Sequence, residues 1–408
     1  MPRLDDYRAV AGDGVIDELC ALAKALKGRS VAHVNTTAVG GGVAEILSRM
    51  VPLINELEIP CRWDLMKGGE DFYAVTKKFH NALHGDTQDV TPRDYQVYED
   101  MVDANLASMD LRDDFVFIHD PQPCALVKAR AKHKNRWLWR CHIDVSRPQA
   151  SVWEFLKPYV EHYDAMVISA PPFAQKVSVP QALIAPSIDP LSDKNRDLTS
   201  LEVDAVLARL GIPRDKPLVT QISRFDRLKD PLGVLKAFKL AKRYVPARLV
   251  LLGGPADDDP EGAQVLAEVR AAVGDDPDVL ILCLPPTSHI EVNAVQRASA
   301  VVLQKSLREG FGLTVSEALW KGRPVIAGAV GGIPLQVLHG RTGVLVHTVE
   351  GAASWIMRLL KDKELADRLG RAGREHVRSN FLLTRHLRDY LMLFLSSEHP
   401  GSDFIRVN

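Results

Sequence analysis

The sequence predicts an α/β protein made of two doubly wound domains, and two observations carry that prediction. Short runs of β-branched and aliphatic residues alternate with longer segments of helical period along most of the chain, which is typical of parallel sheets covered by helices on both faces. The chain also has 408 residues, which exceeds the size at which a single hydrophobic core usually stops growing. We therefore expect one such domain after the other.

The predicted strands fall into two series. The first series is "SVAHVN" (30–35), "CRWDLM" (61–66), "DFVFIH" (114–119), "RWLWRCHI" (136–143) and "DAMVIS" (164–169). The second series is "PLVTQIS" (217–223), "ARLVLLG" (247–253), "DVLILCL" (278–284), "AVVLQK" (300–305), "RPVIAG" (323–328) and "GVLVH" (343–347).

A segment rich in proline, serine and charge separates the two series. It reads "IAPSIDPLSDKNRDL" (184–198) and suits a connection between domains. We predict an N-terminal domain of residues 1–187 and a C-terminal domain of residues 188–384. The segment "SNFLLTRHLRDYLMLFLSS" (379–397) is predicted to form a final amphipathic helix.

Composition excludes several classes of protein. The formal net charge is −1, so nothing favours binding to nucleic acid or to an anionic membrane. The five cysteines are scattered without C-x-x-C spacing, which argues against a disulfide framework or a zinc site and fits a reducing compartment. We see no secretory signal in "MPRLDDYRAV" and no apolar run of the roughly 20 residues that span a bilayer. A cytoplasmic protein is expected.

Three glycines follow the first strand. Gly40, Gly41 and Gly42 precede a helical pattern in "VAEILSRMVPLINEL", so they lie at a strand-to-helix turn. Glycine allows a ligand to approach the backbone closely, and the N–H groups of a helix N-terminus favour anions. The alternative is a tight turn without a ligand. The pattern lacks G-x-G-x-x-G order and a P-loop lysine, which disfavours a nicotinamide or Walker-type site.

Two cations follow the first strand of the second series. Arg224 comes just after that strand and Lys229 five residues later, in "VTQISRFDRLKDPLGVLKAF". A guanidinium and an ammonium at the carboxyl end of a strand can neutralise a diphosphate, because ligands of doubly wound domains bind there. The alternative is a pair of solvated loop cations.

Two glutamates stand eight residues apart in "SLREGFGLTVSEALWKGRPV" (306–325). "TVSE" fits a capping box with Thr314 as the N-cap and Glu317 at the third helical position, so Glu317 has a structural role available. Glu309 precedes the helix and has no capping role. Its carboxylate can accept hydrogen bonds from sugar hydroxyls, while the backbone N–H groups of Gly310, Phe311, Gly312 and Leu313 can meet a phosphate.

Together these residues resemble the retaining glycosyltransferases of family 4. The matching features are the E-x7-E spacing of Glu309 and Glu317, the cations Arg224 and Lys229, and the N-terminal glycine loop, and the resemblance extends from Val31 to about Phe381. It implies the GT-B fold, in which two Rossmann-like domains face each other across a cleft. It further implies that the final helix, about 385–408, packs back on the N-terminal domain.

The resemblance also implies roles for these residues. Glu309 would contact the hydroxyls of the donor sugar, and Glu317 the ribose of the nucleotide. Arg224 and Lys229 would hold the diphosphate, with Gly41 and Gly42 nearby. Two positions depart from the family pattern: Leu335 replaces the usual glutamate of "GGIPE", and Asp230 replaces the frequent glycine after the lysine.

Further segments resemble one branch of this family, the trehalose glycosyltransferring synthases. They are "VNTTAVGGGVAEIL" (34–47), "FHNAL" (79–83), "HDPQP" (119–123), "WLWRCHIDVS" (137–146), "PSIDPLS" (186–192) and "REGFGLTVSEALWKG" (308–322). A lone histidine such as His142 is more often a packed residue, but the resemblance implies a contact with the 6-hydroxyl of the donor sugar. It implies acceptor-binding roles for His119, Asp120, Gln122 and Asp144.

The implied activity is reversible transfer of glucose, with retention, from a nucleoside-diphosphate glucose such as UDP-glucose or ADP-glucose to free glucose, giving α,α-trehalose. No cofactor or metal is required by this interpretation, and stimulation by Mg²⁺ is left open. The D-x-D spacing in "ADDDPEG" (256–262) is interpreted as a solvated loop. No carboxylate nucleophile is evident, which favours front-face attack over a covalent intermediate.

Several alternatives remain open at this stage. A retaining trehalose phosphorylase, which uses glucose 1-phosphate, shares much of the signature. More distant alternatives are another family 4 glycosyltransferase, a sugar-nucleotide epimerase or a non-catalytic sugar-nucleotide sensor. The nucleotide base and the oligomeric state, with a homodimer as one option, are not set by the sequence.

Overall fold

The computed structural model describes residues 2–38, 41–254 and 260–401. The chain divides into two compact units. Unit 1 is Met1–Ser187 with Leu383–Asn408, and unit 2 is Ile188–Leu382. Among the described residues, no helix is long and apolar enough to cross a membrane.

Unit 1 contains a parallel sheet with the strand order β2-β1-β3-β4-β5-β6. Its strands are β1 (Val31–Asn35), β2 (Cys61–Leu65), β3 (Phe115–His119), β4 (Arg136–Arg140), β5 (Ala165–Ile168) and β6 (Gln181–Leu183). The chain order reverses between β1 and β3, whose registers pair Val31 with Phe115 and Val34 with Ile118. Such a reversal is the topological switch point at which α/β sheets bind ligands.

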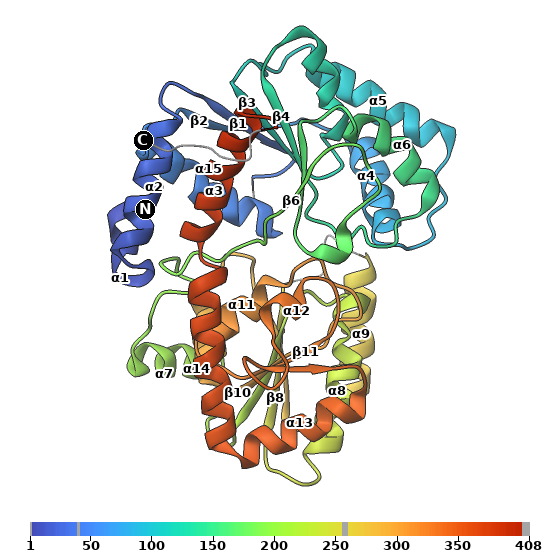
Figure 1. Ribbon diagram of the computed structural model, residues 1–408. Helices are drawn as coiled ribbons and strands as arrows, with labels where there is room; N and C mark the ends of the chain where they lie inside the picture. The colour runs from blue at the N-terminus through green and yellow to red at the C-terminus, as the bar shows by residue number, and fades with distance from the viewer. Residues whose placement is uncertain (1, 39–40, 255–259, 402–408) are drawn as a thin grey trace. The chain divides into compact units, whose positions relative to one another are not determined.

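Helices cover the sheet of unit 1 on both faces (Figure 1). The α-helices are α1 (Arg8–Ala11), α2 (Asp13–Ala25), α3 (Gly41–Glu56), α4 (Glu70–Leu83), α5 (Pro92–Leu106), α6 (Ala150–Val160) and α15 (Leu383–Glu398), and the 3-10 helices are η1 (Leu4–Tyr7), η2 (Cys124–Lys132) and η3 (Pro171–Phe173). The predicted final helix is α15, and it packs against α2 and α3 of this unit.

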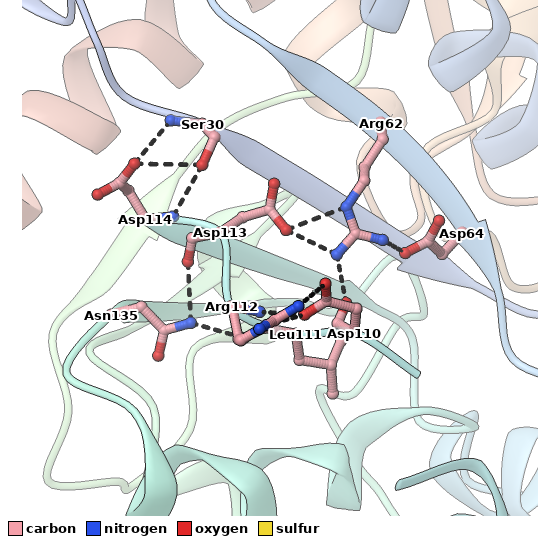
Figure 2. Close-up of polar contacts among 9 residues, drawn as sticks. All are labelled: Ser30, Arg62, Asp64, Asp110, Leu111, Arg112, Asp113, Asp114 and Asn135. Carbon is pink, nitrogen blue, oxygen red and sulfur yellow. Dashed lines mark hydrogen bonds and ion pairs between the residues drawn. The ribbon is translucent and has the colours of Figure 1, made fainter. Parts of the chain in front are cut away.

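The amino-terminal ends of the strands in unit 1 are held by a polar cluster around Arg62 (Figure 2). The Arg62 guanidinium binds the Asp113 carboxylate, with Nε to Oδ2 at 3.0 Å and Nη2 to Oδ2 at 2.6 Å. The Asp114 carboxylate accepts from the backbone N–H of Ser30 at 2.9 Å, and Asn135 Nδ2 donates to the Asp113 carbonyl at 2.9 Å. These contacts fix the loops that enter β1, β3 and β4, at the end of the sheet opposite the candidate site.

Unit 2 contains a second parallel sheet with the order β12-β11-β10-β7-β8-β9, which is the Rossmann arrangement. Its strands are β7 (Leu218–Ile222), β8 (Arg248–Gly253), β9 (Val279–Cys283), β10 (Ser299–Gln304), β11 (Val325–Gly328) and β12 (Val344–Val346). Its helices are α7 (Ser200–Arg209), η4 (Arg227–Lys229), α8 (Pro231–Ala241), α9 (Pro260–Val273), α10 (His289–Ala298), α11 (Leu313–Trp320), α12 (Ile333–Gln336), α13 (Val349–Lys361) and α14 (Lys363–Asn380). The switch point lies between β7 and β10.

Alternate side chains of the strands of unit 2 enter two separate cores. Val219 and Leu249 pack with α8, α9 and α13 on one face. Leu218 and Val250 pack with α7 and α10 on the other. Burial on both faces explains why these strands read as continuous apolar runs in the sequence.

The predicted α/β class and all the predicted strands are confirmed, with ends that differ by at most three residues. The prediction missed β6, a strand of three residues at the edge of its sheet. The strand predicted over 136–143 ends at Arg140, so His142 lies in the loop beyond it.

Candidate functional site

In unit 2, Lys229 and Glu309 meet at the switch point. Lys229 ends η4, whose first turn is capped by the Asp226 carboxylate, and Glu309 follows β10. Lys229 Nζ lies 2.8 Å from Oε1 and 2.7 Å from Oε2 of Glu309. The side chains are 18% and 9% exposed. The sequence placed them in separate motifs, and the fold joins them into one ion pair.

Two further side chains hold the Glu309 carboxylate. Oε2 accepts from Ser306 Oγ at 3.2 Å and from Gln304 Nε2 at 3.3 Å. These contacts orient Glu309 from its own loop, while Lys229 reaches it from the loop after β7. Glu309 lies before α11, whose N-cap is Gly312, and its carboxylate has structural partners that the sequence did not predict.

A second ion pair joins the same two loops. The Lys305 ammonium, 8% exposed, binds the Asp230 carboxylate. Asp230 has φ 51° and ψ 51°, the left-handed conformation that glycine adopts without strain, and its carboxylate also accepts from the N–H of Gly233 at 2.9 Å. Asp230 therefore adopts a backbone conformation that suits glycine, and its side chain provides a helix cap and an ion pair.

The two predicted phosphate-binding cations have different surroundings. Arg224 is 75% exposed and pairs with Asp226 at 3.2 Å, whereas Lys229 is mostly buried against Glu309. Arg224 remains available to solvent at the end of β7.

The segment from Gly310 to Glu317 differs from the sequence prediction in one respect. Helix α11 begins at Leu313 with Gly312 as its N-cap, at φ 81°. The predicted capping box of Thr314 and Glu317 is wrong, because both residues lie inside the helix. Glu317 is 5% exposed, and its Oε1 lies 3.6 Å from Lys194 Nζ.

The loop after β11 packs against the backbone of this segment. Gly332 donates its N–H to the carbonyl of Gly310 at 2.9 Å, and a Cβ at Gly331 would lie 1.7 Å from the Glu309 carbonyl oxygen. Gln336, fully buried, donates from Nε2 to the Phe311 carbonyl and accepts from Ser316 Oγ at 2.6 Å through Oε1. Leu335, which replaces the glutamate of the family pattern, is therefore followed by a glutamine that holds the backbone of the GFG segment. The sequence analysis did not identify this role of Gln336.

In unit 1, the predicted acceptor residues gather after β3 and β4. Asp120 adopts a left-handed φ of 69°, and its Oδ1 accepts the N–H of His142 at 2.8 Å. Its strained backbone at the end of a strand is typical of functional sites. His119 is 1% exposed, and the buried Oε1 of Gln122 has no hydrogen-bond partner among the described residues. Asp144 accepts from the N–H of Ser146 at 2.9 Å.

Burial shifts the pKa values of several ionisable groups of this region toward their neutral forms. It raises the pKa of Asp120 to about 7, lowers the pKa of His33 to about 3, and lowers the pKa values of His119 and His142 well below the usual range. In unit 2, burial lowers the pKa of the Lys321 ammonium to about 7. Burial thus favours the neutral form of the histidines in the candidate site of unit 1.

The remaining predicted residues are only partly described. Gly41 begins α3 and Gly42 follows it, as the strand-to-helix interpretation requires, while Gly40 lies outside the described residues. The D-x-D segment also falls largely outside them, at 255–259. Where the structure is described, no cluster of three or more His, Cys, Asp or Glu side chains is arranged to hold a metal ion.

Comparison with known proteins decides the family. A family model described as "Trehalose synthase, N-terminal domain" matches residues 33–175, and "Glycosyl transferases group 1" matches residues 203–376. The chain is 43% identical to a trehalose synthase of Pyrococcus horikoshii, with 95% of each chain covered, and 44% identical to one of Rubrobacter xylanophilus, with 96% covered. The chain belongs to the trehalose synthase family.

More distant likenesses fit this assignment. A trehalose phosphorylase of Grifola frondosa is 28% identical over 92% of this chain but only 58% of its own length. The solved α,α-trehalose-phosphate synthase of Burkholderia xenovorans superposes with a TM-score of 0.71 at 15% identity, covering 90% of this chain and 99% of its own. The sucrose-phosphate synthase of Thermosynechococcus elongatus gives 0.66 at 20% identity, covering 90% and 98%. The structural likenesses establish the GT-B fold alone.

Proposed function

We propose that the protein is a retaining glucosyltransferase that makes α,α-trehalose from a nucleoside-diphosphate glucose and free glucose. The observation that carries this proposal is the buried Lys229–Glu309 pair at the switch point of unit 2, in a chain that matches trehalose synthases along nearly its whole length. An ammonium and a carboxylate fixed side by side can serve the two chemically different parts of a nucleotide sugar.

Each partner of that pair has a defined task in the proposal. An ammonium carries three donors, and Glu309 takes two of those of Lys229, which leaves one for a diphosphate oxygen. The Glu309 carboxylate accepts hydrogen bonds from the sugar hydroxyls. Glu317, in α11, binds the ribose, and its contact with Lys194 orients the carboxylate.

Charge on the leaving diphosphate is stabilised by Arg224, Lys229 and the N–H groups at the start of α11. Arg224 is exposed enough to move onto a phosphate oxygen. With no side-chain nucleophile assigned, the acceptor hydroxyl attacks the same face that the diphosphate leaves, and a diphosphate oxygen takes its proton.

Unit 1 supplies the groups that bind the neutral acceptor. Asp120 and Gln122 lie on the loop after β3, beside the switch point between β1 and β3, whereas His142, on the loop after β4, contacts the 6-hydroxyl of the donor sugar. The unpartnered Oε1 of Gln122 accepts a hydrogen bond from a glucose hydroxyl, and the Asp120 carboxyl group accepts or donates according to its protonation.

The proposal is tested by incubating the protein with glucose and UDP-, ADP- or GDP-glucose, with EDTA and with Mg²⁺, and identifying the disaccharide by NMR. The expected product is α,α-trehalose, in which the donor carbon keeps its α configuration. A parallel incubation of glucose with glucose 1-phosphate measures the phosphorylase reaction. Trehalose from that mixture alone, conversion of the donor without acceptor, or binding without turnover would each contradict the proposal.

A further inference from the structure

A chain of hydrogen bonds connects the switch point of unit 1 with α15. His33 Nδ1 lies 2.9 Å from His119 Nε2, and His119 Nδ1 lies 3.0 Å from His142 Nε2. At the other end, His386 of α15 places Nδ1 2.9 Å from Ser187 Oγ. Arg140, the last residue of β4, joins the two parts.

Arg140 is fully buried, and each of its guanidinium nitrogens donates a hydrogen bond. Nε donates to His142 Nδ1 at 3.4 Å, and Nη2 donates to the Ile184 carbonyl at 2.9 Å. Nη1 lies 3.1 Å from His386 Nε2 and donates to Tyr390 OH at 3.0 Å. A guanidinium has donors only, so His142 Nδ1 and His386 Nε2 must be unprotonated.

The four histidines are neutral, so each has one N–H. Burial lowers all four pKa values, and the Arg140 charge lowers them further. Because His142 Nδ1 accepts, its Nε2–H donates to His119 Nδ1. His119 then carries its proton on Nε2 and donates to His33 Nδ1, which leaves His33 with an Nε2–H.

The two ends of the network fit these tautomers. His33 Nε2 is buried and has no hydrogen-bond partner among the described residues, so its N–H is the unpaired end of the chain. On the other branch, His386 Nδ1–H has the Ser187 hydroxyl oxygen as an acceptor.

We propose that Arg140 is a positioning residue that sets the tautomers of His142, His119 and His33 in one direction and that of His386 in the other. The structural part of this inference is independent of any reaction, and its catalytic consequence rests on the proposed function. His142 then has both ring nitrogens engaged within unit 1. A substrate hydroxyl can therefore hydrogen-bond to the His142 ring only by donating to Nδ1, the nitrogen that already accepts from Arg140.

Arg140 also connects this ring to both segments through which the chain passes between the units. Ser187 is the last residue of unit 1 before Ile188, and α15 begins where the chain returns at Leu383. Arg385 strengthens the connection by donating to the Ala185 carbonyl at 2.7 Å. The orientation of His142 therefore depends on the correct packing of α15.

The test is NMR of the imidazole nitrogens in protein labelled with ¹⁵N-histidine, with assignments from the single variants H33N, H119N, H142N and H386N. The wild type is expected to show protonated Nε2 in His33, His119 and His142, and protonated Nδ1 in His386. A protonated Nδ1 in His142 would overturn the proposal, whatever the enzyme does. This measurement needs no variant that removes Arg140, so a failure of such a variant to fold leaves the test intact.

Variants then test the role of Arg140. R140M is expected to change the nitrogen spectrum of His142 and to lower kcat by roughly 10- to 100-fold, because a small misplacement of a substrate-contacting group is costly. R248M, which removes a buried arginine that pairs with Asp215 in unit 2, is the matched control and is expected to leave the four histidines unchanged.

H386Q supplies an amide oxygen for Arg140 and an NH₂ group for Ser187, and is expected to restore most of the activity that H386L loses. An unchanged His142 spectrum in folded R140M, or equal losses in H386Q and H386L, would contradict the proposal.

Discussion

The two units treat charge at their switch points in opposite ways. In unit 2, Lys229, Glu309, Lys305 and Asp230 are all charged residues, and they form two ion pairs between neighbouring loops. In unit 1, burial keeps the histidines uncharged and raises the pKa of Asp120 to about 7. The positive charge of that network belongs to Arg140, which lies behind the ring of His142.

This difference corresponds to the two substrates in the proposed reaction. A diphosphate needs cations that are already desolvated and held in place, which pairing provides. A neutral sugar needs hydrogen-bonding groups with a fixed donor or acceptor character, which neutral tautomers provide. In the proposed reaction, the same fold serves a charged ligand in one unit and an uncharged one in the other.

The largest effect is expected from breaking the pair in unit 2. K229M removes a cation from the leaving diphosphate, and turnover should fall by about 10²- to 10³-fold. The same change leaves Glu309 buried without its cation, which should cost about 3 kcal/mol of stability. The double variant K229M/E309Q should recover much of that stability but none of the turnover. Steady-state rates and urea unfolding measure the two effects.

K242M is the matched control for that experiment. Lys242 is 26% exposed and pairs with Asp276 and Asp278, which lie at the amino-terminal side of β9. It should lose stability while keeping turnover near normal. Near-normal turnover in both K229M and E309A would refute the assignment of the donor site.

In unit 1, the neutral state of the buried histidines can be tested through the pH dependence of stability. The pKa values of His33, His119, His142 and His386 lie below the unfolded value of about 6.5, so the unfolded chain binds more protons in acid. Stability should therefore fall as the pH drops below about 6.5, by up to about 1.4 kcal/mol per pH unit for each histidine. The raised pKa of Asp120 acts in the opposite direction between about pH 7 and 4 and offsets part of this loss.

Hydrogen exchange of peptides that contain β3 and β4, measured between pH 7 and 5, reports this loss for unit 1 alone. H386Q removes one titrating group and should make the pH dependence shallower. A stability that does not change between pH 7 and 5, or an H386Q profile as steep as that of the wild type, would show that the histidines are not held neutral.

A smaller effect is expected at Asp230. D230G relieves a left-handed residue, which is worth about 1 kcal/mol, but it removes a helix cap worth about as much and leaves buried Lys305 without its partner. A net loss of about 2–3 kcal/mol in urea unfolding is expected. K305M added to D230G should restore part of it, and D230N, which keeps a cap acceptor, should lose less than D230G. Equal stability of D230G and the wild type would show that the Asp230–Lys305 pair contributes nothing.

Local sequence patterns predicted most of the fold, because buried parallel strands appear in the sequence as continuous apolar runs. They missed β6, whose three residues are partly exposed at a sheet edge and follow Pro180. The Lys305–Asp230 pair joins residues 75 positions apart and depends on β7 and β10 being neighbours. Local sequence patterns could not predict the Arg140 network either. Its residues come together only because β1, β3 and β4 are neighbours in the sheet and because α15, near the end of the chain, packs in unit 1.

The capping box at "TVSE" failed for a local reason. Gly312 can adopt φ 81°, so α11 starts one residue after it and Thr314 becomes the second helical residue. Thr199 of unit 2 shows the arrangement that was expected at Thr314: its side chain accepts from the N–H of Glu202, whose carboxylate accepts from the N–H of Thr199 at 2.7 Å.

The smallest predicted effect follows from this contrast. T199A should destabilise the protein by about 1 kcal/mol, as the loss of a true N-cap does. T314A should change stability by less than about 0.5 kcal/mol, because its hydroxyl caps nothing and the contact of Thr314 with Gln296 uses the backbone carbonyl. Urea unfolding of the two variants side by side measures the difference. If T314A costs as much as T199A, the helix begins at Thr314 after all, and Glu317 then has a capping role that would compete with binding the ribose.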